Sequence, residues 1–340
     1  MKFLLTFFLC LVFNNICRAQ ISQSEDINRT YKNVFIEKGF FDPEEFDLYR
    51  PDVFTYDSDL EEYFIYDYSQ KNLYQISLKS YRVNKYNKLG NGNGSGPGEF
   101  RNPTDICIGN TSLGNKLVVI DSDLSRVSIW DLDKSIFESS FKPKKFIPFR
   151  LSCTNTDIII YNSLGSKKGD FLVFDYNGNE LSSFSDPQEN KNTFLDSGYI
   201  DADSEHIYYS SQGRPILKKI NRSNKKIESK LFVEPTVGEN KASIRTQGDY
   251  IIEKRDQNFI YQSRGIGLFE GYIVVLYSGR KDAFGNVLDF YDKKTLNYNF
   301  SSKIDLYSQF MTLSNNILLV RGYDQKLEKT IFKFYSIEMN

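Results

Sequence analysis

Histidine and carboxylate side chains are the first candidates for chemistry in this sequence. The chain holds a single histidine, His206, beside 44 aspartates and glutamates. One histidine cannot build a multi-histidine metal site, and His206 begins an apolar strand pattern, where a structural role is expected. Three carboxylate pairs stand where strands would end: Asp57/Asp59, Asp121/Asp123 and Asp131/Asp133. They fit no complete calcium-loop spacing and are typical of turns, so we predict no catalytic residue, no metal and no other cofactor.

Cationic side chains recur at the predicted connections that would open on one face of a repeat fold. The arginines expected on this face are Arg101, Arg126, Arg150, Arg214, Arg264, Arg280 and Arg321. A guanidinium group is a planar fork of donors that suits carboxylate, sulfate or phosphate. We therefore take these arginines as candidate ligand-binding residues for an anionic ligand, such as an acidic glycan or an acidic loop of a partner. The alternative is that arginine is simply common in solvated loops.

A glycine-rich run, Gly90 to Gly98, superficially resembles a phosphate-binding loop. It lacks a following Lys-Ser/Thr pair and opens no helical pattern, so we predict a crossover between repeats instead of a nucleotide site. The formal net charge of the chain is −1. A chain so close to neutral is not a general nucleic-acid binder, and we expect no nucleic-acid partner.

The N-terminus has the pattern of an export signal. A basic start is followed by the apolar run Phe3 to Phe13, and the small residues Cys17 and Ala19 precede Gln20. This pattern predicts a signal peptide over residues 1–19. The apolar run is too short for a membrane-spanning helix, and no later segment approaches about 18 apolar residues. The residues before Cys17 match a lipoprotein signal poorly, so we expect export to the periplasm, cell surface or medium without a lipid anchor.

Internal repeats decide the fold prediction. Six short apolar runs each end at a polar or turn-forming residue, and they begin about 41 to 65 residues apart. The runs are Tyr63–Tyr66, Leu117–Ile120, Ile158–Tyr161, Ile207–Tyr209, Tyr272–Tyr277 and Ile317–Val320. Runs of this length suit strands that are buried on both faces, and their spacing brackets that of a propeller blade. We predict an all-β fold, a six-bladed β-propeller of four-stranded antiparallel blades that forms one domain over residues 20–340.

The two ends of the repeat region predict how the ring closes. The sixth repeat stops at Asn340 after its third strand, and Tyr31 to Glu37 forms an unassigned strand before the first repeat. Pairing residues 31–37 with the last blade would satisfy both exposed strand edges. A two-domain β-sandwich and an open β-solenoid are the alternatives, and the spare strand favours the ring.

A family resemblance supports the same fold. The segments Gly94–Ile106, Lys116–Asp121 and Arg126–Asp131 resemble the start of a blade in NHL-type propellers. In particular, they look like the exported six-bladed propeller proteins of Bacteroidota. The detailed match covers only Gly94 to Asp131. The resemblance implies a six-bladed fold and leaves the function open, because propellers host many unrelated functions. The chain departs from the lyase-type members of this group, whose metal sites use several histidines.

Two cysteines remain after the predicted signal peptide, Cys107 and Cys153. Two cysteines are not a disulfide framework for a domain of this size. They either form one bridge or stay as two buried thiols. Free cysteine is among the most buried residue types and packs as a small apolar side chain, so we favour the thiols.

The connection between the fourth and fifth repeats is unusually long and runs from about Glu234 to Arg264. Long insertions on a rigid scaffold often carry function. We expect that deleting Lys241 to Asp256 spares folding and impairs binding. The alternative is an excursion with strands of its own that only packs on the rim.

These observations favour a binding function over an enzymatic one. We predict an exported, non-enzymatic binding or scaffold propeller, monomeric, that recognises a glycan, a peptide or a protein on its loop face. Tyr- and Arg-rich loops suit recognition surfaces. The alternative is a hydrolase or lyase with a carboxylate or metal site in the central channel. A tightly bound metal, or a channel carboxylate with a strongly raised pKa, would favour that alternative.

Overall fold

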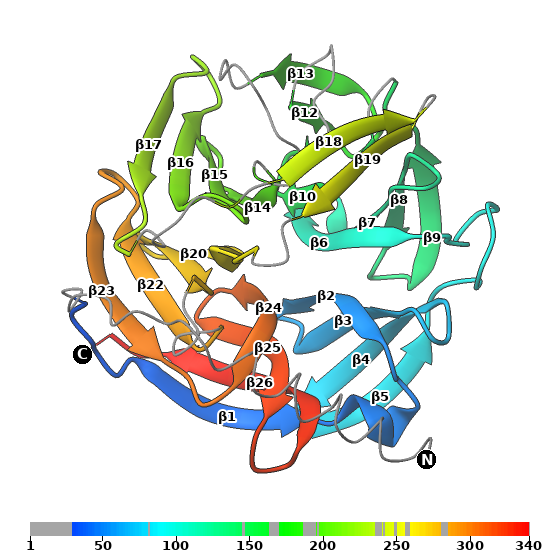
Figure 1. Cartoon of the computed structure of the whole chain (residues 1–340). Coiled ribbons are helices and arrows are strands. Elements are labelled where there is room, and N and C mark those ends of the chain that lie inside the picture. The colour runs from blue at the N-terminus through cyan, green and yellow to red at the C-terminus, as the bar shows by residue number, and fades with distance from the viewer. Residues whose placement is uncertain are drawn as a thin grey trace, which may run out of the picture.

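Six four-stranded antiparallel sheets form a ring in the computed structural model of the protein (Figure 1). The structure describes residues 29–80, 82–144, 147–162, 170–185, 195, 197–234, 240, 242–247, 250–255, 259–279 and 285–339. The prediction of an all-β, six-bladed propeller is confirmed. The described residues contain no helix with the length and hydropathy of a membrane span.

Each blade runs from an inner strand at the channel to an outer strand at the rim. Blade 1 contains β2 (Pro51–Asp57), β3 (Glu62–Asp67), β4 (Asn72–Lys79) and β5 (Arg82–Lys88); blade 2 contains β6 (Pro103–Thr111), β7 (Gly114–Asp121), β8 (Arg126–Asp131) and β9 (Ile136–Phe141). Blade 3 contains β10 (Arg150–Cys153), β11 (Ile158–Tyr161), β12 (Phe171–Phe174) and β13 (Glu180–Phe184); blade 4 contains β14 (Gly198–Ala202), β15 (His206–Ser211), β16 (Ile216–Asn221) and β17 (Ile227–Leu231). Blade 5 contains β20 (Ser263–Phe269), β21 (Tyr272–Tyr277), β22 (Val287–Asp292) and β23 (Tyr298–Lys303); blade 6 contains β24 (Tyr307–Ser314), β25 (Ile317–Asp324), β26 (Lys329–Ile337) and β1 (Phe35–Phe41). A short 3-10 helix, η1 (Pro43–Phe46), follows β1.

The predicted apolar runs form the second strand of every blade: β3, β7, β11, β15, β21 and β25. Their side chains alternate between the two faces of a blade, and neighbouring blades cover both faces. Between blades 2 and 3, for example, Val118 and Ile120 pack with Ile158 and Ile160, and all four are fully buried. In the described part of the chain the core is divided into six apolar clusters, one at each seam between blades.

Aspartates at the strand ends stabilise the turns, as their positions in the sequence predict. Asp57 Oδ1 accepts hydrogen bonds from the backbone N–H groups two and three positions further on, at 2.8 and 3.1 Å. Asp121 and Asp131 each accept a bond of 3.0 Å from the N–H three positions further on. These carboxylates therefore act as local turn acceptors.

The N-terminal segment closes the ring. Strand β1 pairs antiparallel with β26 as the outer strand of blade 6, so the predicted closure is confirmed. The strand begins at Phe35 and not at Tyr31, because the residues before it pair with blade 5. Tyr31 forms a bridge with Ser301 of β23, and the Lys32 N–H donates to the Ser301 carbonyl at 2.9 Å. The segment therefore lies across two neighbouring blades.

Arg29 fixes the start of this segment in a buried ion cluster. Its Nε and Nη2 donate to the two carboxylate oxygens of Asp289 at 3.1 and 2.8 Å, and its Nη1 donates to Glu234. The guanidinium also lies 4.2 Å from the ring centre of Tyr277. Burial raises the pKa of Asp289, while the Arg29 charge opposes that rise. Arg29 thus pairs with two carboxylates that are both almost fully buried.

A two-stranded hairpin, β18 (Ala242–Gln247) and β19 (Tyr250–Arg255), is inserted between blades 4 and 5. It accounts for the length of this connection, which carries strands of its own. The Asn240 side chain pins its base by donating to the carbonyls of Gly213 and Ile260 at 2.8 and 2.6 Å. In Figure 1 the hairpin projects across the ring in front of β6 and β10.

Candidate ligand site at the channel mouth

The inner strands of the propeller enclose a central cavity of about 220 Å³. Every blade contributes to its wall, through residues that include Thr55, Ile106, Ser152, Ile200, Ile266 and Met311. A second cavity of about 430 Å³, which we call the mouth cavity, lies at the starts of the inner strands. Its wall includes Arg50, Asp52, Tyr68, Thr104, Asp105, Phe149, Arg150, Tyr199 and Phe310. Asp105 and Tyr199 line both cavities, so the mouth cavity adjoins the channel.

Arg150, the first residue of β10, is the most constrained cation of the mouth cavity. Its guanidinium carbon lies 4.6 Å from the ring centre of Phe149 and 4.7 Å from that of Tyr199. Its Nη1 donates to the carbonyl of Thr104 at 3.0 Å. These contacts fix the plane of the guanidinium, since rings on Arg favour stacking. The Arg150 Nε and the Thr104 Oγ1 are buried and have no hydrogen-bond partner among the described residues.

Asp105 joins the inner strands of blades 2 and 3. Its Oδ2 accepts a hydrogen bond from the Leu151 N–H at 2.9 Å, and its Oδ1 accepts one from the Ile106 N–H at 3.0 Å. Burial raises the pKa of Asp105 to about 6, although the neighbouring Arg150 charge and these two hydrogen bonds oppose the rise. Each oxygen keeps a lone pair for a further donor.

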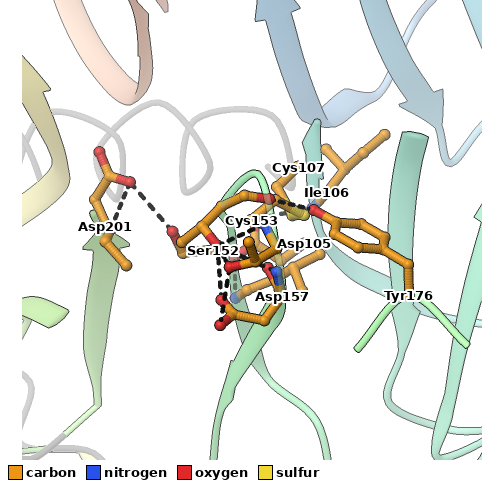
Figure 2. The surroundings of a disulfide bond; sticks show 12 residues. Asp105, Ile106, Cys107, Ser152, Cys153, Asp157, Tyr176 and Asp201 are labelled. Carbon is orange, nitrogen blue, oxygen red and sulfur yellow. Dashed lines mark hydrogen bonds between the residues drawn. A yellow bond between two sulfur atoms is a disulfide. The ribbon is translucent and has the colours of Figure 1, made fainter. Parts of the chain in front are cut away.

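A second carboxylate, Asp201 of β14, lies in the wall of the central cavity. Its Oδ1 accepts from the Ala202 N–H at 2.8 Å and from the Ser152 hydroxyl at 3.2 Å. Burial raises the pKa of Asp201 to about 6 as well. In Figure 2 Ser152 lies between Asp201 and the disulfide bond. The channel wall therefore carries two carboxyl groups that take up protons near neutral pH.

Cys107 of β6 and Cys153 of β10 form a disulfide bond, with their Cα atoms 5.7 Å apart (Figure 2). The expectation of two free thiols, which we favoured from the sequence, is wrong. The ring brings β6 and β10 together at the channel, as the hydrogen bond between Asp105 and Leu151 demonstrates. Two cysteines separated by 46 positions therefore meet, and the bond ties the strands that carry Asp105 and Arg150.

The predicted arginines occupy different surroundings. Arg150 lines the mouth cavity. Arg126 donates to the carbonyls of Ser95 and Gly96 at 2.9 and 3.0 Å and so holds the glycine-rich crossover in place. Arg321 pairs with Asp52 of the mouth cavity at 3.0 Å. The structure thus brings two of these three arginines to the mouth cavity, one directly and one through Asp52.

Among the described residues, Arg101, Arg214 and Arg264 are not in the wall of the mouth cavity. Arg101 is exposed and Arg214 is half-buried. Arg264 donates to the Ser278 hydroxyl at 3.0 Å, and burial lowers its pKa. Arg280 lies outside the described residues. A ligand-binding role for the whole set stays a prediction.

Sequence reasoning missed Arg50, which lines the mouth cavity and lies over Tyr68 at 5.6 Å from the ring centre. The available signal was its position directly before Pro51, the first residue of an inner strand. Arg150 lies at the start of the inner strand of blade 3, as the first residue of β10. Within the described residues, no group of three or more His, Cys, Asp or Glu side chains is arranged to hold a metal ion.

No protein-family model and no curated protein matches this sequence. The fold is similar to that of a Bacteroides fragilis protein named for its inferred export, with a TM-score of 0.54 and 14% identity over 94% of this chain and 98% of that chain. The WD40 repeats of RRP9 are also similar, with a TM-score of 0.51 and 8% identity over 92% of this chain and 100% of that chain. At these identities the likeness establishes the propeller fold alone.

Proposed function

We propose that the protein is an exported, non-enzymatic binding module that holds an anionic ligand in its mouth cavity. The observation that carries this proposal is the state of Arg150. Its guanidinium lies in the wall of the mouth cavity, against the rings of Phe149 and Tyr199. A guanidinium held in this way offers charge-assisted hydrogen bonds to a carboxylate, sulfate or phosphate group that enters the cavity.

Three observations support export. The sequence begins with the pattern of a signal peptide, and a protein of similar fold is named for its inferred export. The bond between Cys107 and Cys153 is typical of proteins that leave the reducing cytosol. We also propose that the protein is related to the NHL-type propellers of Bacteroidota and that it is a monomer.

The direct test is calorimetric titration of the mature chain, residues 20–340, with acidic and neutral glycans at low and high salt. We expect acidic glycans to bind, and their affinity to fall as salt screens the guanidinium. Arg150→Ala should abolish the binding, whereas Arg82→Ala on the outer strand β5 should leave it unchanged. Equal binding of acidic glycans to both variants would overturn the proposal.

The raised pKa values of Asp105 and Asp201 favour a second candidate, a hydrolase or lyase that uses channel carboxylates. A carboxyl group with a pKa of about 6 donates or accepts a proton readily near neutral pH. This candidate predicts that the chain cleaves an acidic oligosaccharide, with new reducing ends as the readout. Asp105→Asn should stop the cleavage, and absence of product from the unmodified chain would exclude this candidate for that substrate.

A further inference from the structure

We infer that β5, the outer strand of blade 1, is a docking edge to which an acidic segment of a partner protein adds as a further strand. The inference is independent of the proposed ligand site, because β5 lies at the rim of the ring and lines neither cavity (Figure 1). It follows from an open hydrogen-bonding edge, from cations that have no acidic partner, and from the way in which the N-terminal segment pairs with blade 5.

The first step concerns the edge of β5. One side of the strand pairs with β4, from Lys79 opposite Arg82 to Tyr74 opposite Lys88. No other strand in the described part of the chain pairs with the opposite side, and no backbone hydrogen bond from another described segment reaches it. The backbone N–H and C=O groups on that side can therefore pair with an extended peptide.

The second step concerns charge. β5 contains three cations, Arg82, Lys85 and Lys88, and no acidic residue. Each of the other five outer strands contains at most one cation. The three side chains are exposed, and none of them forms a hydrogen bond or an ion pair with another described residue. An anionic partner can therefore reach all three.

The register of blade 1 gathers cations on one face. Arg82 lies directly opposite Lys79 of β4, which is also exposed. Lys85 lies opposite Ser77, two positions before Lys79, so it shares the face of the other two cations. Like charges directly opposite each other destabilise a strand pair. An acidic segment beside β5 would relieve this repulsion.

The acidic residues near this face do not form ion pairs with its cations. Glu62 belongs to the same row as Ser77 and Lys85, but it lies two strands inward on β3 and accepts from the Ser77 hydroxyl at 3.2 Å. The acidic helix η1 packs on the other face, where the ring centres of Phe46 and Tyr86 are 6.0 Å apart. The cations beside the open edge are therefore left for a partner.

Blade 5 demonstrates that an outer strand of this propeller accepts an added segment. The Ser301 N–H of β23 donates to the Thr30 carbonyl at 2.8 Å, and the Lys32 N–H donates to the Ser301 carbonyl at 2.9 Å. The N-terminal segment thus pairs with the outer edge of that blade. At β5, an acidic segment would satisfy both the open edge and the cations, whereas an acidic polysaccharide would satisfy only the cations. The observations therefore favour a protein partner.

The test is a fluorescence anisotropy titration of the mature chain, residues 20–340, with a labelled peptide of about eight residues that alternates glutamate and threonine. We expect the peptide to bind, and its affinity to fall as salt screens the charges. The double substitution Arg82→Glu and Lys85→Glu should weaken binding at least about tenfold, because it replaces attraction by repulsion. Lys230→Glu makes the same change of charge at an exposed position of the outer strand β17. It is the matched control and should change the affinity less than about twofold.

Strand pairing is tested separately from charge. The same peptide methylated at every backbone nitrogen keeps its glutamates but has no backbone donors, so it should bind at least about tenfold more weakly. Hydrogen exchange of residues 82–88 should slow when the unmethylated peptide is bound, because its strand covers the open edge.

Each contrary outcome overturns the inference in a different way. Equal binding of the methylated peptide, or unchanged hydrogen exchange at saturation, would mean that charge alone attracts the peptide. Full binding to the double variant would place the peptide elsewhere. If the peptide does not bind at all, the cations only protect the edge against association. Arg150→Ala should leave peptide binding unchanged, so this inference and the proposed function can fail independently.

Discussion

Two seams of the ring are held together by different kinds of interaction. The inner seam, between β6 and β10, is held at the channel by the Cys107–Cys153 bond and by Asp105. The closing seam, where the N-terminal segment lies across blades 5 and 6, is held at the rim by β1 and by the Arg29 ion cluster. The inner seam is a covalent link that also forms part of the candidate site. The closing seam depends on strand pairing and buried charge.

This difference determines how each seam should respond when one of its interactions is removed. A disulfide stabilises mainly by restricting the unfolded chain, so its removal leaves no buried charge uncompensated, although the two strands that it ties gain freedom to move. Removal of one partner from a buried ion cluster leaves an uncompensated charge in the native state itself. We therefore expect the closing seam to be the more sensitive to a single substitution, and the inner seam to link stability with ligand binding.

The largest effect is expected for Arg29→Ala. Asp289 would remain buried without its cation, so the free energy of unfolding should fall by about 3–5 kcal/mol in urea titrations. Arg29→Lys keeps the charge and should lose less. Arg82→Ala, on the outer strand β5, should change it by no more than about 0.5 kcal/mol. A loss below about 1 kcal/mol for Arg29→Ala would mean that strand pairing alone holds the closing seam.

The next effect is expected for the double substitution Cys107→Ala and Cys153→Ala. Opening the inner seam should lower the free energy of unfolding by about 2–4 kcal/mol and weaken ligand binding, because the bond ties the strands of Asp105 and Arg150. Treating the unmodified chain with a reductant should reproduce the loss, while the double variant should not respond to it. If the double variant and the unmodified chain bind the ligand with the same affinity, the disulfide has no role in ligand binding.

A smaller effect is expected from pH. The native pKa of Asp105, about 6, lies above its ordinary value in an unfolded chain, so the native state holds a proton that the unfolded chain releases. The stability from this group is therefore present at low pH and is lost as the pH rises through about 6. Asp105→Asn should change the difference in unfolding free energy between about pH 4.5 and 7.5 by roughly 2 kcal/mol.

The decisive measurement compares the unmodified chain with Asp105→Asn by the slope of the unfolding free energy against pH. A comparison is needed because Asp305 and Asp324 have lowered pKa values, so their contribution to stability changes with pH in the opposite direction. Their contribution is common to both proteins and cancels. Identical slopes would show that Asp105 titrates as it does in the unfolded chain.

The smallest effect is expected for deletion of Lys241 to Asp256. Strands β18 and β19 pair with each other and lie outside both seams. Asn240, which pins the base of the hairpin, remains. The free energy of unfolding should therefore change by less than about 0.5 kcal/mol in urea titrations. A loss comparable with that of the disulfide would show that the hairpin stabilises the ring.

The sequence was sufficient for the blades and for the closing strand, but not for the disulfide of the inner seam or for the Arg29 ion cluster of the closing seam. The apolar runs are local patterns, so each second strand, for example Leu117 to Ile120, is visible in its own neighbourhood. The closing strand was predictable because its hydrogen-bonding edge had no partner nearby. The ion pair of Arg29 was not predictable, because Asp289 lies 260 positions away and only the closed ring brings the two residues together.

The candidate site was predicted in type and only partly in place. The expectation of guanidinium groups on one face identified Arg150, but the same reasoning included Arg126, which is used to hold a crossover. Asp105 has the same residue type as the turn aspartates. Its environment differs because it lies on an inner strand, which no local pattern reveals.

Blade 6 combines β1, the first strand of the chain, with β24, β25 and β26, the last three. The blade therefore cannot be completed until the C-terminal strands have been synthesised. Phe35 pairs with Ile337, so β1 waits for about 300 residues to be made before its partner exists. At about 5–20 residues per second this interval is roughly 15–60 s. Throughout it the nascent chain exposes an unpaired strand edge, which is a template for wrong pairing. Strand β1 therefore cannot pair within blade 6 until β26 has been made, and during this interval its open edge is a site where a chaperone would prevent wrong pairing.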